Sequence, residues 1–180
     1  MKKLFLCLTP LLLASPSLRA ADVALGVSLR NDTNSIYLHS DLSNQLRLEG
    51  ILSYRKTQDE SPSELNNSQY TTRASSLGVG LFFRKELHPS VTSYIGSRLY
   101  YSRYSVESGS EFPQEQKLEG LEIAPTVGFE YFPIKNVSIG GDIGLAYGRD
   151  HGSVTLNGSS SPSKSYELKT VTSLVLRVYF

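Results

Sequence analysis

The sequence of 180 residues contains no tryptophan, one methionine and one cysteine, so it offers neither a disulfide framework nor a cysteine metal site. An excess of one charge is also missing, because 18 Lys and Arg residues stand against 17 Asp and Glu residues. This balance argues against a partner held through nucleic acid phosphates. What is abundant is tyrosine and glycine, 11 and 14 residues, which indicates strands and tight turns in one domain rather than a helical bundle.

Residues 1–20 have the order of a secretory signal peptide. Lys2 and Lys3 precede a short apolar run, and small residues lead to Ala20. The run is interrupted at Pro10 and is shorter than the roughly 20 residues that span a bilayer as a helix, which favours a cleaved signal over a retained anchor. We expect cleavage after Ala20, which removes Cys7 and leaves residues 21–180 as one domain without a thiol or lipid anchor.

The remaining sequence alternates apolar and small or polar residues with a period of two, which is the period of β-strands. In the first such segment Val23, Leu25, Val27 and Leu29 alternate with Ala24, Gly26, Ser28 and Arg30. The same pattern predicts eight strands in all, at residues 23–30, 35–40, 45–55, 72–84, 91–103, 118–132, 137–148 and 166–180.

The expected connections differ in length at the two ends of the strands. Short connections are expected at residues 41–44, 85–90 and 133–136, and long polar loops at 56–71, 104–117 and 149–165, with a brief one at 31–34. Short turns at one end and long loops at the other are typical of outer membrane barrels with an even number of strands and periplasmic termini.

A soluble barrel of the lipocalin type would show the same alternation with its apolar set inside. Here the polar set consists mainly of Gly, Ala and Ser with few charges, which is too small and sparse for a solvated exterior. Such residues suit a narrow interior, while Leu, Val, Ile and the aromatic residues face lipid. Tyr54, Tyr101, Tyr131 and Tyr147 lie near strand ends, where aromatic girdles form. The fold class expected is all-β, an eight-stranded antiparallel up-and-down transmembrane β-barrel that follows a cleaved signal peptide.

The last strand carries the most specific motif. Leu174, Leu176, Val178 and Phe180 alternate up to the final residue, and this pattern resembles the C-terminal signal that the barrel-assembly machinery of Gram-negative bacteria recognises. With eight strands and the glycines of residues 137–148, the chain resembles the OmpX, opacity-protein and OmpA transmembrane-domain group. The resemblance implies a monomer in the cell outer membrane, in contact with its lipids and with lipopolysaccharide, without a cofactor or nucleic acid.

Six charged residues stand at the alternate strand positions whose side chains face the interior, which we call the inward parity: Arg47, Glu49, Arg98, Glu122, Asp142 and Arg177. Opposite charges in a narrow interior can neutralise one another. In barrels of the OmpA type such a set crosslinks the lumen and can act as a gate. We expect it to be mainly a structural plug here.

A catalytic alternative rests on His151, Ser153 and Glu167, which are similar to the His, Ser and Glu of lipid A deacylase barrels. A His can activate a Ser hydroxyl for attack on an ester while a carboxylate orients the His. Two features depart from that pattern: Val154 follows the Ser, and Glu167 has the opposite parity. His39 and His88 fall at the other end of the strands, so the three histidines do not predict a metal site.

The function expected is therefore structural or a surface interaction, such as adhesion to a host or cell surface or maintenance of envelope integrity, through the extracellular loops. A small-solute pore and the deacylase are the alternatives. An eight-stranded barrel leaves an interior only wide enough for side chains, which disfavours the pore.

Overall fold

The computed structural model describes residues 23–30, 34–63, 66–108, 114–156 and 158–180, so the predicted signal peptide lies outside the described residues. Eight strands make up nearly all of the described chain: β1 (Val23–Arg30), β2 (Asn34–Asp41), β3 (Leu46–Ser63), β4 (Asn66–His88), β5 (Val91–Ser108), β6 (Gln114–Ile134), β7 (Val137–Leu156) and β8 (Ser159–Tyr179). No helix in these ranges is long and apolar enough to cross a membrane.

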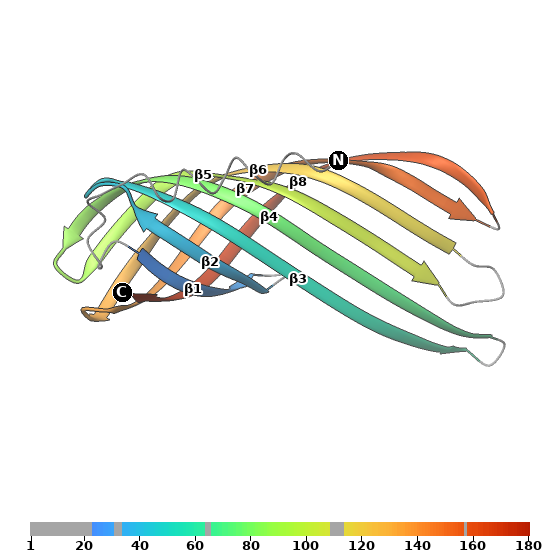
Figure 1. Ribbon diagram of the computed structural model, residues 1–180, viewed down its shortest axis with the longest axis horizontal. Coiled ribbons are helices and arrows are strands. Elements are labelled where there is room, and N and C mark those ends of the chain that lie inside the picture. The colour runs from blue at the N-terminus through green and yellow to red at the C-terminus, as the bar shows by residue number, and fades with distance from the viewer. Residues whose placement is uncertain (1–22, 31–33, 64–65, 109–113, 157) are drawn as a thin grey trace.

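The strands form one closed antiparallel ring in sequence order (Figure 1). Closure is made by β1 and β8, which pair from Ala24 with Tyr179 to Arg30 with Ser173. The tight connections at residues 42–45, 89–90 and 135–136 lie at the same end of the barrel as Val23 and Phe180. We call this the turn end and the opposite one the hairpin end, and in outer membrane barrels the turn end is periplasmic.

The alternation predicted from the sequence sets which side chains face out. Leu25, Val27 and Leu29 of β1 are exposed on the outside, whereas Ala24 and Ser28 are buried inside. The same separation runs around the ring, so the exterior carries an apolar belt and the interior carries small, polar and charged residues. A soluble protein has the opposite arrangement of apolar and polar side chains. The apolar exterior therefore places the belt in a lipid bilayer.

The three expected long loops are wrong in extent, because most of their residues are strand. β3 and β4 stay paired to Ser63 and Asn66, β5 and β6 to Glu107 and Glu115, and β7 and β8 to Leu156 and Ser159. The apolar alternation ends where the strands leave the bilayer, but backbone pairing needs no apolar side chain and continues along polar sequence. Gly158, with a φ of 81°, lies in the tight turn that joins β7 to β8.

The ring is uneven in height, because β1 and β2 are much shorter than the other strands (Figure 1). The ladder between β2 and β3 ends at Ser35 with Ser53, where the two hydroxyl oxygens lie 2.6 Å apart. Beyond this point the ladders among the described residues join β3 to β4, and residues 159–171 of β8 to β7. Among the described residues, the hairpin half of the barrel is therefore a six-stranded sheet with β3 and β8 at its edges.

Candidate functional site

A continuous chain of ion pairs fills the interior toward the turn end. Arg47 donates to Asp41 at 2.9 Å and to Glu130 at 2.9 Å, and Arg177 donates to the other oxygen of Glu130 at 2.6 Å. The charges alternate along this chain, which runs in the order Arg84, Asp41, Arg47, Glu130, Arg177, Glu49, Arg98 and Asp142. Four cations and four anions therefore neutralise one another inside the barrel.

Neutral groups complete the hydrogen bonding of this ion chain. Asp142 accepts from Arg98 at 2.8 Å, from Ser173 at 2.6 Å and from Tyr94 at 3.1 Å. The Tyr179 hydroxyl lies 3.0 Å from both Glu130 and Arg47. Buried charges are tolerated when paired and hydrogen-bonded in this way.

Five of the six predicted interior ions join this chain, and Glu122 does not. Glu122 lies nearer the hairpin end, where Lys169 is 3.3 Å from its carboxylate. Three further members were missed: Asp41, Arg84 and Glu130. Glu130 and Arg84 have the inward parity on their strands, so parity was a usable signal for both, whereas Asp41 ends β2 next to a turn. The side chain of Arg30 lies outside the described residues.

An apolar layer follows the ion chain toward the hairpin end. Tyr37, Ile51, Tyr100, Ala124 and Ala146 form one buried cluster from five different strands. A Cβ added at Gly78 would lie 2.6 Å from Cδ1 of Tyr100, so the absence of a side chain at this position makes room for the ring. Together the apolar layer and the ion chain close the lumen.

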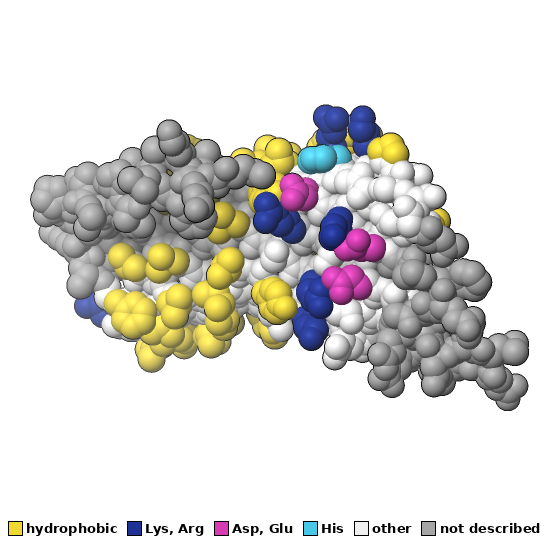
Figure 2. All heavy atoms as spheres, turned by 45° about the vertical axis from the view of Figure 1, so that its right-hand side comes forward, with side chains coloured by type: hydrophobic (Ala, Val, Ile, Leu, Met, Phe, Trp, Pro, Cys, Tyr) yellow, Lys and Arg dark blue, Asp and Glu magenta, His cyan; other side chains and the backbone are white. Residues whose placement is uncertain are grey.

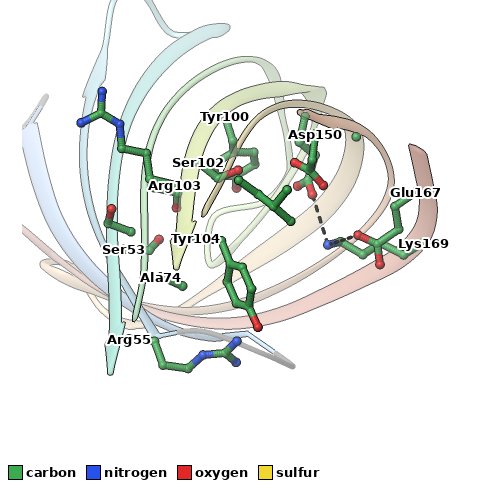
Figure 3. A pocket seen from close by; sticks show the side chains of 15 residues that line it. Ser53, Arg55, Ala74, Tyr100, Ser102, Arg103, Tyr104, Asp150, Glu167 and Lys169 are labelled. Carbon is green, nitrogen blue, oxygen red and sulfur yellow. Dashed lines mark hydrogen bonds and ion pairs between the residues drawn. The ribbon is translucent and has the colours of Figure 1, made fainter. Parts of the chain in front are cut away.

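Above this layer the interior is hollow, which corrects the expectation of a lumen filled with side chains throughout. The cavity has a volume of about 370 Å³. Tyr100 forms part of its floor, and polar residues from β3 to β8 line its walls, among them Arg55, Tyr104, Asp150, Glu167 and Lys169 (Figure 3). Sequence parity marks these residues as inward-facing but does not indicate which of them share a cavity.

Outside the barrel, charged side chains follow the apolar belt at the hairpin end (Figure 2). Arg73 lies 2.6 Å from Glu107, and Arg103 lies 3.3 Å from Glu119. The hydrogen bond from Arg103 to the Tyr101 hydroxyl raises the pKa of Arg103, and the bond from Lys117 to Glu115 raises the pKa of Lys117. Both side chains are therefore cationic at neutral pH, and each lies next to a carboxylate.

The residues of the catalytic alternative do not come together. His151 and Ser153 lie on β7 opposite Lys164 and Pro162 of β8, with the outward parity. Glu167 has the inward parity, lines the cavity and accepts a hydrogen bond from Lys169 at 2.9 Å. His151 and Ser153 therefore do not form a catalytic triad with Glu167.

The histidines are also dispersed, and no cluster of metal-ligating side chains occurs among the described residues. His39 is buried inside the barrel with its ring edge-on to Tyr179, at a centroid distance of 5.3 Å. His88 is exposed next to a tight turn, where its Nδ1 lies 2.9 Å from the Ser90 hydroxyl. The two rings therefore differ in environment although both lie toward the turn end.

The residues of the expected assembly signal all lie on the exterior. Leu174, Leu176, Val178 and Phe180 are exposed along the lipid-facing side of β8. The backbone N–H of Phe180 donates to the carbonyl of Val23 at 3.0 Å, next to the seam that closes the ring. Their role in assembly stays a prediction.

Neither a protein-family model nor a curated protein sequence matches this chain. Solved structures are similar in fold. A major outer membrane protein from Thermus thermophilus has a TM-score of 0.58 at 13% identity, with 86% of this chain and 97% of that chain covered. The solution structure of Outer Membrane Protein W from E. coli has a TM-score of 0.55 at 10% identity, covering 91% of this chain and 100% of that chain.

At these identities the similarity concerns the fold alone. It agrees with the features of the chain itself: a closed ring of eight antiparallel strands, an apolar exterior with exposed tyrosines near strand ends and a charged, hydrogen-bonded interior. These features require a bilayer around the belt. The chain is an eight-stranded β-barrel protein of the outer membrane.

Proposed function

We propose that the protein is a non-conducting barrel that presents β-hairpins at the cell surface to bind an extracellular partner, in adhesion or in maintenance of the envelope. The observation that carries this proposal is the extension of three paired hairpins beyond the apolar belt, made by β3–β4, β5–β6 and β7–β8. A barrel needs only about 9–11 residues per strand to cross a membrane, so the added length serves something outside it.

Closure of the lumen supports an interaction role over a pore. The ion chain crosses the barrel between β3, β6 and β8, where Arg47, Glu130 and Arg177 are each fully buried. The apolar layer adds a second obstruction. A hydrated solute would have to displace both layers to pass.

The edges of β3 and β8 indicate how a partner would bind. An exposed edge strand presents free backbone N–H and C=O groups, to which an extended segment of another protein can add as a further strand. Within the described part of the chain, residues 56–63 of β3 and 159–171 of β8 lie at such edges on the hairpin side. The partner proposed is an extended protein segment at a host or cell surface.

Two further partners belong to this proposal. The acyl chains of lipopolysaccharide would contact the apolar belt. Its phosphates would contact the cationic side chains of Arg103 and Arg149, since both residues face outward just beyond Tyr101 and Tyr147. The barrel-assembly machinery would recognise the exterior residues of β8. The protein would act as a monomer.

Register-preserving truncation of the hairpins tests the proposed function. Removal of residues 58–71, with an Asn-Gly turn inserted, leaves Thr57 paired with Thr72. Removal of 106–116 leaves Ser105 paired with Lys117, and removal of 153–162 leaves Gly152 paired with Ser163. Cells that express each shortened barrel would be scored for adhesion, serum survival and envelope integrity. We expect at least one truncation to lower one of these while the amount of barrel in the outer membrane stays unchanged. Wild-type behaviour of every single and combined truncation would contradict the proposal.

A further inference from the structure

The cavity at the hairpin end has the size of a small-molecule site. Its volume of about 370 Å³ lies within the range of ligand pockets, about 300–1,000 Å³. Tyr100 links its floor to the buried apolar layer, so the cavity is blind toward the periplasm. A ligand that enters here is held and not passed through.

One wall of the cavity is acidic. Glu122, Asp150 and Glu167 come from β6, β7 and β8, and all three line it. The ammonium of Lys169 lies 3.3 Å from Glu122 and 2.9 Å from Glu167, which shows that these carboxylates hold a primary ammonium group. Two carboxylates contact Lys169 and Asp150 adds a third to the same wall, so its carboxylates outnumber its lysine.

Asp150 extends the acidic wall away from Lys169. Its carboxylate lies directly against Gly120, in the space that a Cβ at this position would occupy. The Ser165 hydroxyl donates to its other oxygen at 3.3 Å. The carboxylate is thus positioned at the cavity and can accept hydrogen bonds from a second ammonium group.

The opposite side of the cavity is cationic and aromatic. Arg55 on β3 lies across from Glu167 and Lys169, and Tyr104 on β5 projects between the two walls (Figure 3). A guanidinium group binds phosphate and carboxylate oxygens, and a tyrosine face attracts an ammonium group. The cavity is therefore polarised, with an acidic wall and a basic wall.

The cavity also has a side entrance. Ser53 and Arg55 on β3, and Glu167 and Lys169 on β8, line it from the two strands that flank the short β1–β2 hairpin. This gap begins at the level of Leu29, Ile36 and Tyr54, the last outward apolar residues of their strands. As far as the described residues define it, the gap therefore opens at the outer edge of the membrane as well as toward the medium.

We propose that this cavity binds a small zwitterionic group that joins a primary ammonium to a phosphate by a short linker. The ammonium lies against Asp150 and the acidic wall, and the phosphate lies against Arg55. The same chemistry occurs in a free solute such as O-phosphoethanolamine and in the headgroup of phosphatidylethanolamine, which the side entrance would admit from the bilayer.

Fluorescence of a single introduced tryptophan tests this site, because the sequence contains no tryptophan. The full-length protein with Tyr104→Trp, refolded in detergent, would be titrated with O-phosphoethanolamine, with ethanolamine and with inorganic phosphate. We expect saturable binding of O-phosphoethanolamine at least tenfold tighter than of either half. Equal affinity for the zwitterion and for one of its halves, or no saturable response measured both by fluorescence and by calorimetry on the wild-type protein, would overturn the proposal.

Charge variants assign the two walls. Arg55→Gln, Asp150→Asn and Glu167→Gln should each weaken O-phosphoethanolamine binding about tenfold. Arg73→Gln and Glu107→Gln, which alter an exposed ion pair on neighbouring strands outside the cavity, should leave it unchanged. Every variant would first be shown to fold by its mobility on unheated gels. Because there are three cavity variants, the test still stands if one of them does not fold. Full affinity in the folded cavity variants would overturn the proposal.

A second experiment distinguishes the two sources of the ligand, a free solute and a lipid headgroup. The Tyr104→Trp protein would be placed in phosphatidylglycerol vesicles with and without phosphatidylethanolamine. A spectral change that requires phosphatidylethanolamine and is lost with Arg55→Gln would assign the site to the lipid headgroup. Response to the soluble zwitterion alone would support the site with a free solute as its ligand. Absence of both responses would overturn the proposal.

Discussion

At the scale of single residues, Glu130 holds the interior ion chain together. Its two carboxylate oxygens accept separately from Arg177 at 2.6 Å and from Arg47 at 2.9 Å, and the Ser138 hydroxyl lies at 3.1 Å. Both arginines are fully buried, so neither can turn to water if the carboxylate is lost. An uncompensated buried charge costs far more than an exposed ion pair gains.

We therefore expect Glu130→Gln to lower the free energy of unfolding by about 3–5 kcal/mol. The matched control is Glu107→Gln, which breaks the half-exposed pair with Arg73 and should cost no more than about 1 kcal/mol. Urea unfolding of the refolded barrel in lipid vesicles measures both. Equal effects of the two substitutions would show that the ion chain contributes little to stability.

Gly78 allows a second residue-scale prediction. Because Tyr100 lies 2.6 Å from the site of an added Cβ, Gly78→Ala should displace the ring and cost about 1–3 kcal/mol through overpacking. Gly50→Ala is the control, because the nearest atom to its added Cβ is the Leu38 carbonyl oxygen at 3.7 Å. The same unfolding measurement applies, and a Gly78→Ala protein as stable as the control would contradict the packing described for the apolar layer.

At the scale of strands, the sequence predicted which strands exist and which of their side chains face outward, but it did not predict how long the strands are. The membrane-spanning part of each strand followed from alternation of apolar residues such as Leu77, Val79 and Leu81, because lipid selects apolar side chains on one face only. Beyond the bilayer that selection ends, so residues 149–156 of β7 showed no period and were expected to be loop. Their backbone pairing with β8 is invisible in side-chain hydropathy.

For the candidate site, too, the sequence predicted which residues face inward but not which of them meet. Parity placed Arg47, Glu49 and Arg177 inside, and their mutual neutralisation followed from burial. It could not separate Glu122 from them, because that depends on strand tilt and stagger, which place Glu122 beside Lys169, nearer the hairpin end. The cavity depends likewise on the short β1–β2 hairpin and on residues far apart in sequence.

The last strand supports a prediction that separates assembly from stability. Phe180 faces outward with 62% of its surface exposed, whereas the Tyr179 side chain is buried and its hydroxyl contacts Arg47 and Glu130. We expect Phe180→Ala to reduce the fraction of protein in the outer membrane, with export and signal cleavage intact. Tyr179→Phe should reduce resistance to urea with its outer membrane fraction unchanged. Cell fractionation and precursor analysis decide the first point, and equal membrane yields for Phe180→Ala and wild type would refute it.

At the scale of the whole molecule, the lumen consists of an ion chain, an apolar layer and a cavity open to the outside. This order predicts that the protein shows no large, stable conductance steps in planar bilayers. Truncation of the hairpins should not change this, because the obstruction lies in the membrane-spanning half. Large, stable steps from the wild-type barrel would contradict the closed lumen and favour a pore.

Ring closure leads to the last prediction. Each membrane-spanning strand is paired on both sides, and the seam between β1 and β8 extends from Ala24 with Tyr179 to Arg30 with Ser173. Detergent therefore finds no unpaired edge in this half from which to open the sheet, and the unheated protein should migrate faster on SDS gels than the boiled protein. The barrel with residues 58–71 and 106–116 removed should show the same shift, because those residues lie outside the seam and the ion chain. Identical mobility of unheated and boiled wild-type protein would contradict the closed ring. Loss of the shift in the shortened barrel alone would show that the hairpins, and not only the membrane-spanning half, hold the ring closed.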